Sequence, residues 1–231
     1  MLYWLTGFSD GGDVFNLFRY ITFRAGCAFA TALIFGFLFG RPLIDLLRRK
    51  QGKGQPIRED GPQTHFAKAG TPTMGGLLIL SALMVSTLLW ARLDNPYVWI
   101  VVLVTLAFGM IGFADDFAKV TKQNTKGVSS RIRFLSGLAI AALASYAAAQ
   151  FHPGPLTNQL ALPFFKNALI DLSLFFVPFG MIVIVGAANA VNLTDGLDGL
   201  AIMPVMIAGA TLGVISYVVG NYNFAEYLGV H

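Results

Sequence analysis

Charged residues are scarce in this chain, and their scarcity excludes most soluble proteins. Asp, Glu, Lys and Arg make up 12% of the 231 residues, whereas 55% of the residues are hydrophobic. A soluble globular domain usually carries about 25% charged residues. The sequence therefore predicts that a lipid bilayer is the main solvent of this chain.

Cysteine is almost absent as well, since Cys27 stands alone. A single thiol cannot form an intramolecular disulfide and has no partner at the spacing of a metal site. We interpret Cys27 as a small buried apolar side chain. The features of a signal peptide are also missing, because residues 1–16 are acidic at Asp10 and Asp13 and the apolar run that follows is long. We expect the first span to be retained.

Long apolar runs are what the sequence does contain. A spanning helix needs about 20 mostly apolar residues to cross roughly 30 Å of hydrocarbon. The runs that qualify are 21–47, 74–91, 97–113, 134–151, 172–191 and 200–219. Glycine and proline inside them are compatible with membrane helices, since neighbouring groups satisfy the freed backbone. We predict an all-α, polytopic transmembrane helix bundle that forms one integral-membrane domain over residues 1–231.

Positive charge is concentrated in alternate loops. Eleven of the sixteen Lys and Arg residues lie within 48–68 and 119–133. Cytoplasmic loops carry an excess of Lys and Arg, so these loops and residues 189–199 are predicted to be cytosolic, with the N-terminus and residues 152–171 outside. Basic loops beside spans indicate topology and contact with anionic headgroups, and we expect no nucleic-acid partner. The external stretch around Leu156–Phe165 is expected to form a small hairpin.

Two adjacent carboxylates, Asp115 and Asp116, follow the third run. A negative charge is unfavourable at the C-terminal end of a helix, and adjacent carboxylates repel unless a cation or proton intervenes. A magnesium or phosphate-handling role is therefore favoured over a solvated helix end. The alternative is that Lys119 and Lys122 simply neutralise the pair.

The segment between the fifth and sixth runs is dense in polar side chains. Amides and carboxylates suit a nucleobase and ribose, and backbone N–H groups at a helix start suit a phosphate. Glycines there allow a close approach of a ligand. The alternative is that Asp198 or Thr194 caps the sixth span. We favour a nucleotide-sugar loop, whose candidate residues are Asn189, Asn192, Asp195, Gly196 and Asp198.

The third motif is Lys-Ala-Gly-Thr-Pro-Thr-Met-Gly-Gly at residues 68–76. A structural interpretation is complete, with Thr73 as an N-cap and Gly75 and Gly76 allowing close helix packing. Lys68 adds a charge that suits a diphosphate. On these residues alone, the structural and the functional interpretation are equally supported.

Together these motifs resemble the signatures of the bacterial phospho-N-acetylmuramoyl-pentapeptide transferase family. The wider polyprenyl-phosphate sugar-1-phosphate transferase superfamily shares the paired aspartates, whereas Thr-Pro-Thr-Met-Gly-Gly at 71–76 favours this member. The resemblance extends over essentially the whole chain. Further similar segments are 60–62, 95–97, 125–127 and 221–224.

The resemblance implies an enzyme of peptidoglycan synthesis in the bacterial inner membrane. It would transfer phospho-N-acetylmuramoyl-pentapeptide from UDP-N-acetylmuramoyl-pentapeptide to undecaprenyl phosphate and release UMP, with Mg²⁺ as cofactor. Asp115 would be a base or phosphate-handling group and Asp116 its companion at the metal. Asn192, Asp195 and Asp198 would form the uridine or metal loop. The substrate-binding set would also include Lys68, Thr73, Asn189 and Gly196, and the metal ligands would be Asp116 and Asp198.

The resemblance also carries expectations about the extent of the chain. Family members have about ten spans, whereas this sequence ends at His231. We therefore expect an N-terminal portion, with a further metal ligand beyond residue 231 and with 221–231 as an external loop before a seventh span. A homodimer is a further expectation.

Two rival functions remain open at this point. One is a related transferase that loads N-acetylglucosamine-1-phosphate from UDP-N-acetylglucosamine onto a polyprenyl phosphate. The other is a transporter, since acids within membrane segments often mark ion paths. Against the transporter, Asp115, Asp116, Asp195 and Asp198 all follow the ends of apolar runs, where a soluble substrate meets lipid.

Overall fold

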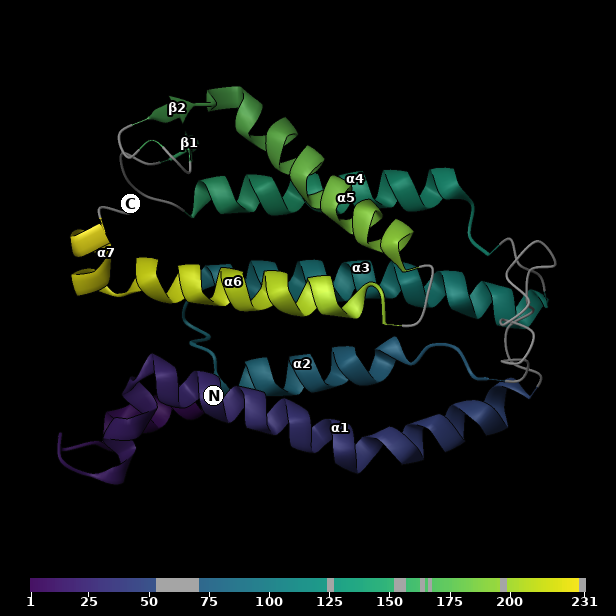
Figure 1. Cartoon of the computed structure of the whole chain (residues 1–231), viewed down its shortest axis with the longest axis horizontal. Coiled ribbons are helices and arrows are strands. Elements are labelled where there is room, and N and C mark those ends of the chain that lie inside the picture. The colour runs from purple at the N-terminus through teal and green to yellow at the C-terminus, as the bar shows by residue number, and fades with distance from the viewer. Residues whose placement is uncertain are drawn as a thin grey trace. The chain divides into compact units, whose positions relative to one another are not determined.

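In the part of the chain that it describes, the computed structural model consists of helices, the turns between them and a two-stranded sheet (Figure 1). It forms two compact units, Met1–Ile140 and Ala141–His231. The residues that it describes are 1–52, 71–123, 127–151, 157–162, 165, 168–195 and 199–228.

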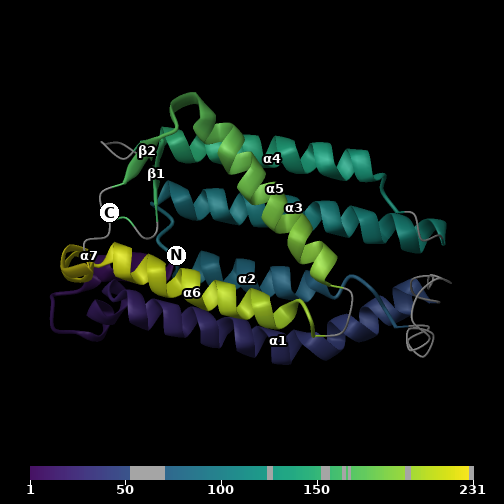
Figure 2. The same cartoon turned by 45° about the horizontal axis from the view of Figure 1, so that its top comes forward.

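The first unit is built on three long helices. Two 3₁₀ helices, η1 (Leu2–Phe8) and η2 (Val14–Arg19), precede α1 (Ile21–Gln51), and α2 (Gly76–Trp90) and α3 (Pro96–Lys122) follow. α4 (Ser130–Gln150) begins in this unit. α1 and α2 lie side by side (Figure 2), and α2 also contacts α3. The positions of α1 and α3 are thus both fixed against α2.

Local signals in the sequence explain where these helices start and stop. Asn95 caps α3, because its Oδ1 accepts a hydrogen bond of 2.9 Å from the backbone N–H of Tyr97, and Pro96 takes the first helical position. α1 ends at Gly52, whose φ of 60° suits glycine. The basic residues 48–50 in the last turn of α1 complement the helix dipole.

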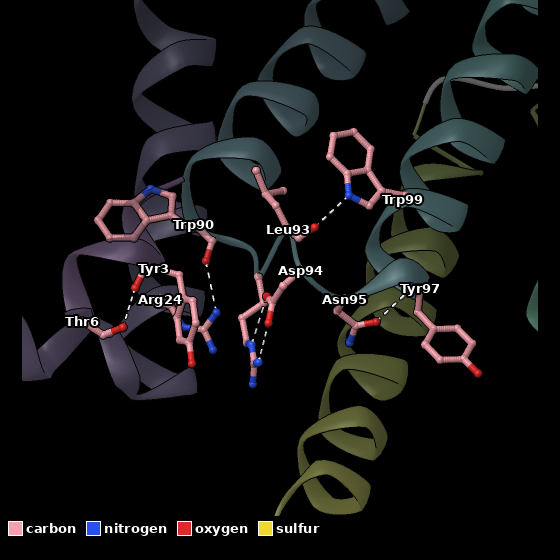
Figure 3. A network of polar contacts seen from close by, with 10 residues as sticks. Tyr3, Thr6, Arg24, Trp90, Leu93, Asp94, Asn95, Tyr97 and Trp99 are labelled. Atoms are coloured by element: carbon pink, nitrogen blue, oxygen red, sulfur yellow. Dashed lines mark hydrogen bonds and ion pairs between the residues drawn. The ribbon is translucent and has the colours of Figure 1, made fainter. Parts of the chain in front are cut away.

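The N-terminal residues are tied to the helices by a polar and aromatic cluster (Figure 3). The ring of Tyr3 lies 4.9 Å from the guanidinium carbon of Arg24 and 4.8 Å from that of Arg92. Arg24 Nη1 donates to the carbonyl of Trp90 at 3.3 Å, and Arg92 pairs with Asp94 at 2.6 Å. We call these five residues the Tyr3 cluster. It joins η1 to α1 and to the turn between α2 and α3.

The second unit contains the end of α4, a two-stranded hairpin and the helical elements that follow it. β1 (Gln159–Ala161) pairs antiparallel with β2 (Leu169–Asp171), with Leu160 opposite Ile170. The predicted hairpin is confirmed, although its second strand lies beyond Phe165. The helical elements that follow are η4 (Ser173–Phe175), α5 (Phe176–Thr194), α6 (Ile202–Gly220) and α7 (Tyr222–Leu228).

The predicted external loop at 221–231 is wrong for residues 222–228, which form α7. The backbone carbonyl of Asn221 accepts a hydrogen bond of 2.9 Å from Ala225, and its Oδ1 accepts one of 3.5 Å from Phe224. Asparagine is among the preferred residues for starting a helix in this way.

The all-α transmembrane architecture is confirmed, and six helices correspond to the six predicted runs. Five are long and apolar enough to cross a membrane, whereas Gly76–Trp90 is apolar but shorter. Most of their large apolar side chains are exposed, and the buried hydrophobic residues are the small Ala82, Val102, Ala141, Ala144 and Val185. Small side chains let membrane helices approach closely. The exposed apolar surface fits a chain whose outer faces meet lipid.

The end of the third run is a further correction. The run was predicted to stop at residue 113, but α3 continues to Lys122. Asp115 and Asp116 therefore lie within a helix, with more than a turn of helix after them. The fall in hydropathy after Phe113 marks the end of the apolar stretch and not the end of the helix.

Candidate active site

The two adjacent aspartates of α3 have different surroundings. Asp115 is buried, with 6% of its surface exposed. Its Oδ2 lies 2.6 Å from Lys119 Nζ and 3.4 Å from Arg133 Nη1, and its Oδ1 accepts a hydrogen bond of 2.9 Å from the backbone N–H of Val128. Three donors therefore satisfy this carboxylate, which explains how a buried negative charge is tolerated inside the unit.

Gly127 allows the chain after α3 to reach Asp115. Its φ is +58°, and a Cβ at this position would meet Asp115 Oδ1 and also the Lys119 side chain at 3.0 Å. Only glycine combines this left-handed backbone with such a close approach. Asp115 thereby links α3 to the segment just before α4, and Arg133 in the first turn of α4 also contacts Asp115.

Asp116 is more open, with 30% of its side chain exposed. Its Oδ2 accepts a hydrogen bond of 2.8 Å from Thr73 Oγ1. Its Oδ1 lies 3.7 Å from Lys119 Nζ, so this lysine is shared between the two carboxylates. We call Thr73, Asp115, Asp116, Lys119 and Arg133 the acid-pair cluster.

The predicted N-cap role of Thr73 is wrong. α2 begins at Gly76 with Gly75 as its N-cap, and no side chain caps it. The hydroxyl of Thr73 is instead bonded to Asp116, which lies 43 positions away. The backbone of Thr73 is held by Gln51, whose Nε2 donates to the Thr73 carbonyl and whose Oε1 accepts from the Thr73 N–H, both at 2.9 Å.

The polar segment after the fifth run begins inside a helix. α5 extends through Asn189 and Asn192 to Thr194, and Asp195 follows it. Asn189 Nδ2 donates to the carbonyl of Val185, and Thr194 Oγ1 donates to that of Ala190, each at 2.8 Å. Asn192 and Asp195 are exposed to solvent.

Two details of this segment differ from the prediction. Thr194 was one alternative cap of the sixth span, but it is the last residue of α5, and α6 begins after Ala201, whose side chain makes no capping hydrogen bond. Residues 189–194 form the end of α5 and not a loop. The remaining predicted residues Lys68, Gly196 and Asp198 lie outside the described residues.

Lys119 was predicted only as a cation that neutralises the acid pair, and the structure confirms that it pairs with both carboxylates. Lys119 stands four positions after Asp115, so the spacing of a helical ion pair pointed to that contact. Arg133 was interpreted as a topology signal, and Gln51 was not singled out. Their partners are 18 and 22 positions away, so no local pattern indicated these contacts.

The two carboxylates of the acid-pair cluster can be compared with the ligands that Mg²⁺ usually binds. This ion usually binds one or two carboxylates together with waters and substrate phosphates. Asp116 fits as one such ligand, because its carboxylate is partly exposed, accepts from a neutral hydroxyl and lies 3.7 Å from Lys119 Nζ, farther than Asp115 does. Asp115 fits less well, since two cations and an N–H already occupy its oxygens. Within the described part of the chain, no group of three or more metal-ligating side chains occurs.

The sequence matches a family model and a family signature over parts of the chain, and individual relatives over its whole length. The model for Glycosyl transferase family 4 matches residues 98–230, and Phospho-N-acetylmuramoyl-pentapeptide-transferase signature 1 matches residues 68–80, which include Thr73. Proteins named phospho-N-acetylmuramoyl-pentapeptide-transferase are similar to it at 72% identity over 231 residues in Ruegeria pomeroyi, 69% over 232 in Dinoroseobacter shibae and 58% over 231 in Rhodopseudomonas palustris strain BisA53.

Each of these matches covers 100% of this chain and 64% of the relative. The resemblance found in the motifs is thereby confirmed. Because the family model covers more than half of the chain and the helices have the length and hydropathy of spans, the chain is a multi-pass membrane protein that belongs to glycosyl transferase family 4.

Proposed function

We propose that this chain transfers phospho-N-acetylmuramoyl-pentapeptide from its UDP carrier to undecaprenyl phosphate, releasing UMP and forming the first lipid-linked precursor of peptidoglycan. The observation that carries the proposal is the hydrogen bond between Thr73 and Asp116. It joins the segment matched by the transferase signature to the paired aspartates of the family model. Two motifs distant in sequence thus meet at one point.

The acid-pair cluster suits the handling of phosphate. Lys119 and Arg133 bring two positive charges to Asp115, and cations at this point favour a ligand that carries several negative charges. We assign Asp115 the phosphate-handling role, exerted through these cations, because both of its oxygens are engaged by donors. Phosphoryl transfer depends mainly on positioning and electrostatic stabilisation, and a rigid cluster of this kind supplies both.

Asp116 would hold the magnesium ion, together with Asp198 as proposed from the sequence. When bound, Mg²⁺ offsets the negative charge of a diphosphate. For such an ion, this chain would present the Asp116 carboxylate, whose orientation is fixed by its hydrogen bond from Thr73. Lys68, as a diphosphate contact, remains a proposal from the sequence.

The end of α5 supplies the chemistry for recognising the uridine nucleotide. Asn192 and Asp195 are exposed and carry amide and carboxylate groups that suit a base and a ribose. Asn189 has its amide nitrogen bonded to Val185, which fixes the orientation of the amide. We propose these residues, with Gly196 and Asp198, as the nucleotide-binding set.

The proposed location is the bacterial inner membrane, with the N-terminus periplasmic and the acid-pair cluster at the cytosolic side. The basic residues of the last turn of α1 and of α3 support this orientation. Undecaprenyl phosphate would then come from the bilayer and the UDP-sugar from the cytosol. We also propose that the enzyme is a homodimer.

The test is Mg²⁺-dependent release of UMP by the intact gene product, given UDP-N-acetylmuramoyl-pentapeptide and undecaprenyl phosphate. Asp116→Asn is expected to lower release by about 100-fold or more, and Asp198→Asn is measured beside it. Asp94→Asn is the matched control, because Asp94 is half exposed and pairs with Arg92 in the Tyr3 cluster. It should keep wild-type activity.

Two outcomes would contradict the proposal. Release from UDP-N-acetylglucosamine in place of the pentapeptide substrate would indicate the related transferase. A folded wild-type protein that conducts ions without any nucleotide and releases no UMP would indicate a transporter. Equal activity of Asp116→Asn and wild type would show that the assignment of Asp116 is wrong.

A further inference from the structure

Gln51 makes an unusual pair of contacts for the last residue of a helix. Its side-chain amide both donates to the carbonyl of Thr73 and accepts from the Thr73 N–H, each at 2.9 Å. A neighbouring β-strand would satisfy the backbone in the same reciprocal way. Gln51 lies outside residues 68–80 and 98–230, which the transferase signature and the family model match.

The backbone that Gln51 holds has a conformation that needs support. Met74 follows Thr73 with a φ of 69°, a left-handed value that is uncommon for residues other than glycine. Such a conformation persists where the surrounding structure over-determines it. Gln51 fixes the chain just before Met74, and the first turn of α2 fixes it just after, through a bond of 3.1 Å from Leu77 N–H to the Met74 carbonyl.

The pairing of α1 with α2 does not depend on Gln51. The two helices pack along one another and are also joined near the other end of α2, where Trp90 Nε1 donates to Thr31 Oγ1 at 2.9 Å. Closer to Gln51, α1 runs near α2 at Gly40, where an added Cβ would lie 3.7 Å from the Leu78 side chain of α2. What depends on Gln51 is the position of the Thr73 backbone, and the Thr73 hydroxyl contacts Asp116.

We propose that Gln51 is a positioning residue of the active site, which acts on Asp116 through Thr73. The chain of contacts runs from the Gln51 amide to the Thr73 backbone, and from the Thr73 hydroxyl to the Asp116 carboxylate. It keeps that carboxylate in one orientation while substrates bind and react. This inference rests on the function proposed above.

The amide of glutamine is specific for this task. Glutamate retains the acceptor for the Thr73 N–H but loses the donor to the Thr73 carbonyl, and its charge would face that carbonyl. Asparagine retains both groups on a side chain that is one methylene shorter. We therefore expect Gln51→Glu and Gln51→Asn to lower kcat for UMP release, as Gln51→Ala does.

The kinetic test compares these variants with a matched control. Gln123 directly follows α3 as its C-cap, and its Nε2 donates to the carbonyl of Val120 in that helix at 2.7 Å. In the intact gene product, Gln51→Ala should lower kcat for UMP release about 10- to 100-fold, the size expected for misplacement of a reacting group. KM for both substrates should change less than about 3-fold, and Gln123→Ala should behave as wild type.

A double-mutant cycle separates positioning from a general loss of structure. Thr73→Val removes the hydroxyl while keeping the shape of the side chain, and Thr73→Ser keeps the hydroxyl. If Gln51 acts through that hydroxyl, Gln51→Ala should lower kcat in the Thr73→Ser background. In the Thr73→Val background, the same change should lower kcat by less than about a further 2-fold. Equal losses in both backgrounds would overturn the proposal.

Hydrogen exchange supplies a readout that does not depend on catalysis. Because the Thr73 N–H is bonded to Gln51, peptides covering residues 71–75 should exchange faster in Gln51→Ala and as in wild type in Gln123→Ala. Unchanged exchange in Gln51→Ala would overturn the proposal. A wild-type protein that releases no UMP would overturn the proposed function instead, and exchange would still show whether Gln51 holds Thr73.

Discussion

The two ends of α2 each carry a polar network, and the networks differ in how far their charges are withdrawn from water. In the Tyr3 cluster, the side chains of Arg92 and Asp94 are 50% and 49% exposed. In the acid-pair cluster, those of Lys119 and Asp115 are 17% and 8% exposed. Removing charges from water is costly unless they are paired. The first network serves as an anchor, whereas the second holds charges at a cost in stability, as active sites commonly do.

The carboxylates of the two networks also differ in how far along the chain their partners lie. Arg92 and Asp94 are two positions apart, so a short stretch of chain makes their pair. Asp115 and Asp116 instead contact residues 13, 18 and 43 positions away. The comparison predicts that changes in the acid-pair cluster affect both activity and stability, while changes in the Tyr3 cluster affect stability alone.

The largest effect should come from Asp115→Asn. The amide cannot balance Lys119 and Arg133, which are left without their buried counter-charge. We expect a loss of about 2 kcal/mol in the free energy of unfolding and loss of UMP release. Thermal unfolding in detergent micelles and the UMP assay would measure the two effects. Asp94→Asn makes the same chemical change at the other end of α2, and it should lower unfolding free energy and UMP release far less. Equal losses in the two variants would contradict the comparison.

A second contrast uses two glycines with positive φ. A Cβ on Gly127 would meet Asp115 and Lys119, whereas one on Gly11, at φ +96°, would meet nothing within 4 Å. Gly11→Ala should lower the free energy of unfolding by about 1 kcal/mol through backbone strain alone. Gly127→Ala should lower the free energy of unfolding by more than that. It should also lower UMP release, because Asp115 must move. If both variants lost the same stability and kept full activity, Asp115 would not need its present position.

The Tyr3 cluster can be tested by Tyr3→Leu, which keeps apolar bulk but removes the ring between Arg24 and Arg92. We expect a loss of about 1 to 2 kcal/mol in unfolding free energy, with kcat unchanged. Tyr20→Leu is the control, because Tyr20 is 55% exposed. A fall in kcat for Tyr3→Leu would mean that the two ends of α2 are coupled.

The smallest expected effect is a dependence of stability on pH. The hydrogen bond from Arg92 holds the pKa of Asp94 below its ordinary value. A carboxyl whose pKa is lower in the folded state contributes stability above its unfolded pKa and loses it as the pH falls through the folded value. Between pH 7 and pH 3, wild type should therefore lose slightly more thermal stability than Asp94→Asn. Identical curves for the two proteins would show that the Arg92 pair does not stabilise the fold.

Hydropathy was sufficient to predict the spans, because the thickness of the bilayer sets the length of each apolar run. It did not predict the end of α3, since a helix continues in water when its side chains are satisfied. Asp115 and Lys119 form an i,i+4 pair that supports this continuation. α7 was missed for a related reason, because a helix outside the apolar spans leaves no hydropathy signal.

The candidate site was predictable as a set of residue types but not as a set of contacts. The sequence indicated Asp115, Asp116 and Thr73, and the structure brings them together in one cluster. The roles of Asn189, Asn192 and Asp195 stay predictions, as do those of Lys68, Gly196 and Asp198, which lie outside the described residues.

By itself, the sequence determined that this is a polytopic membrane protein, and its motifs indicated the transferase family, because hydropathy and motif identity are local properties of the chain. Only the tertiary structure decided that Thr73 serves Asp116 and does not cap α2. It also decided that Arg133 and Gln51 belong to the site. These contacts join residues far apart in the chain, and they exist only because the tertiary structure brings the ends of α1 and α3 close to the starts of α2 and α4.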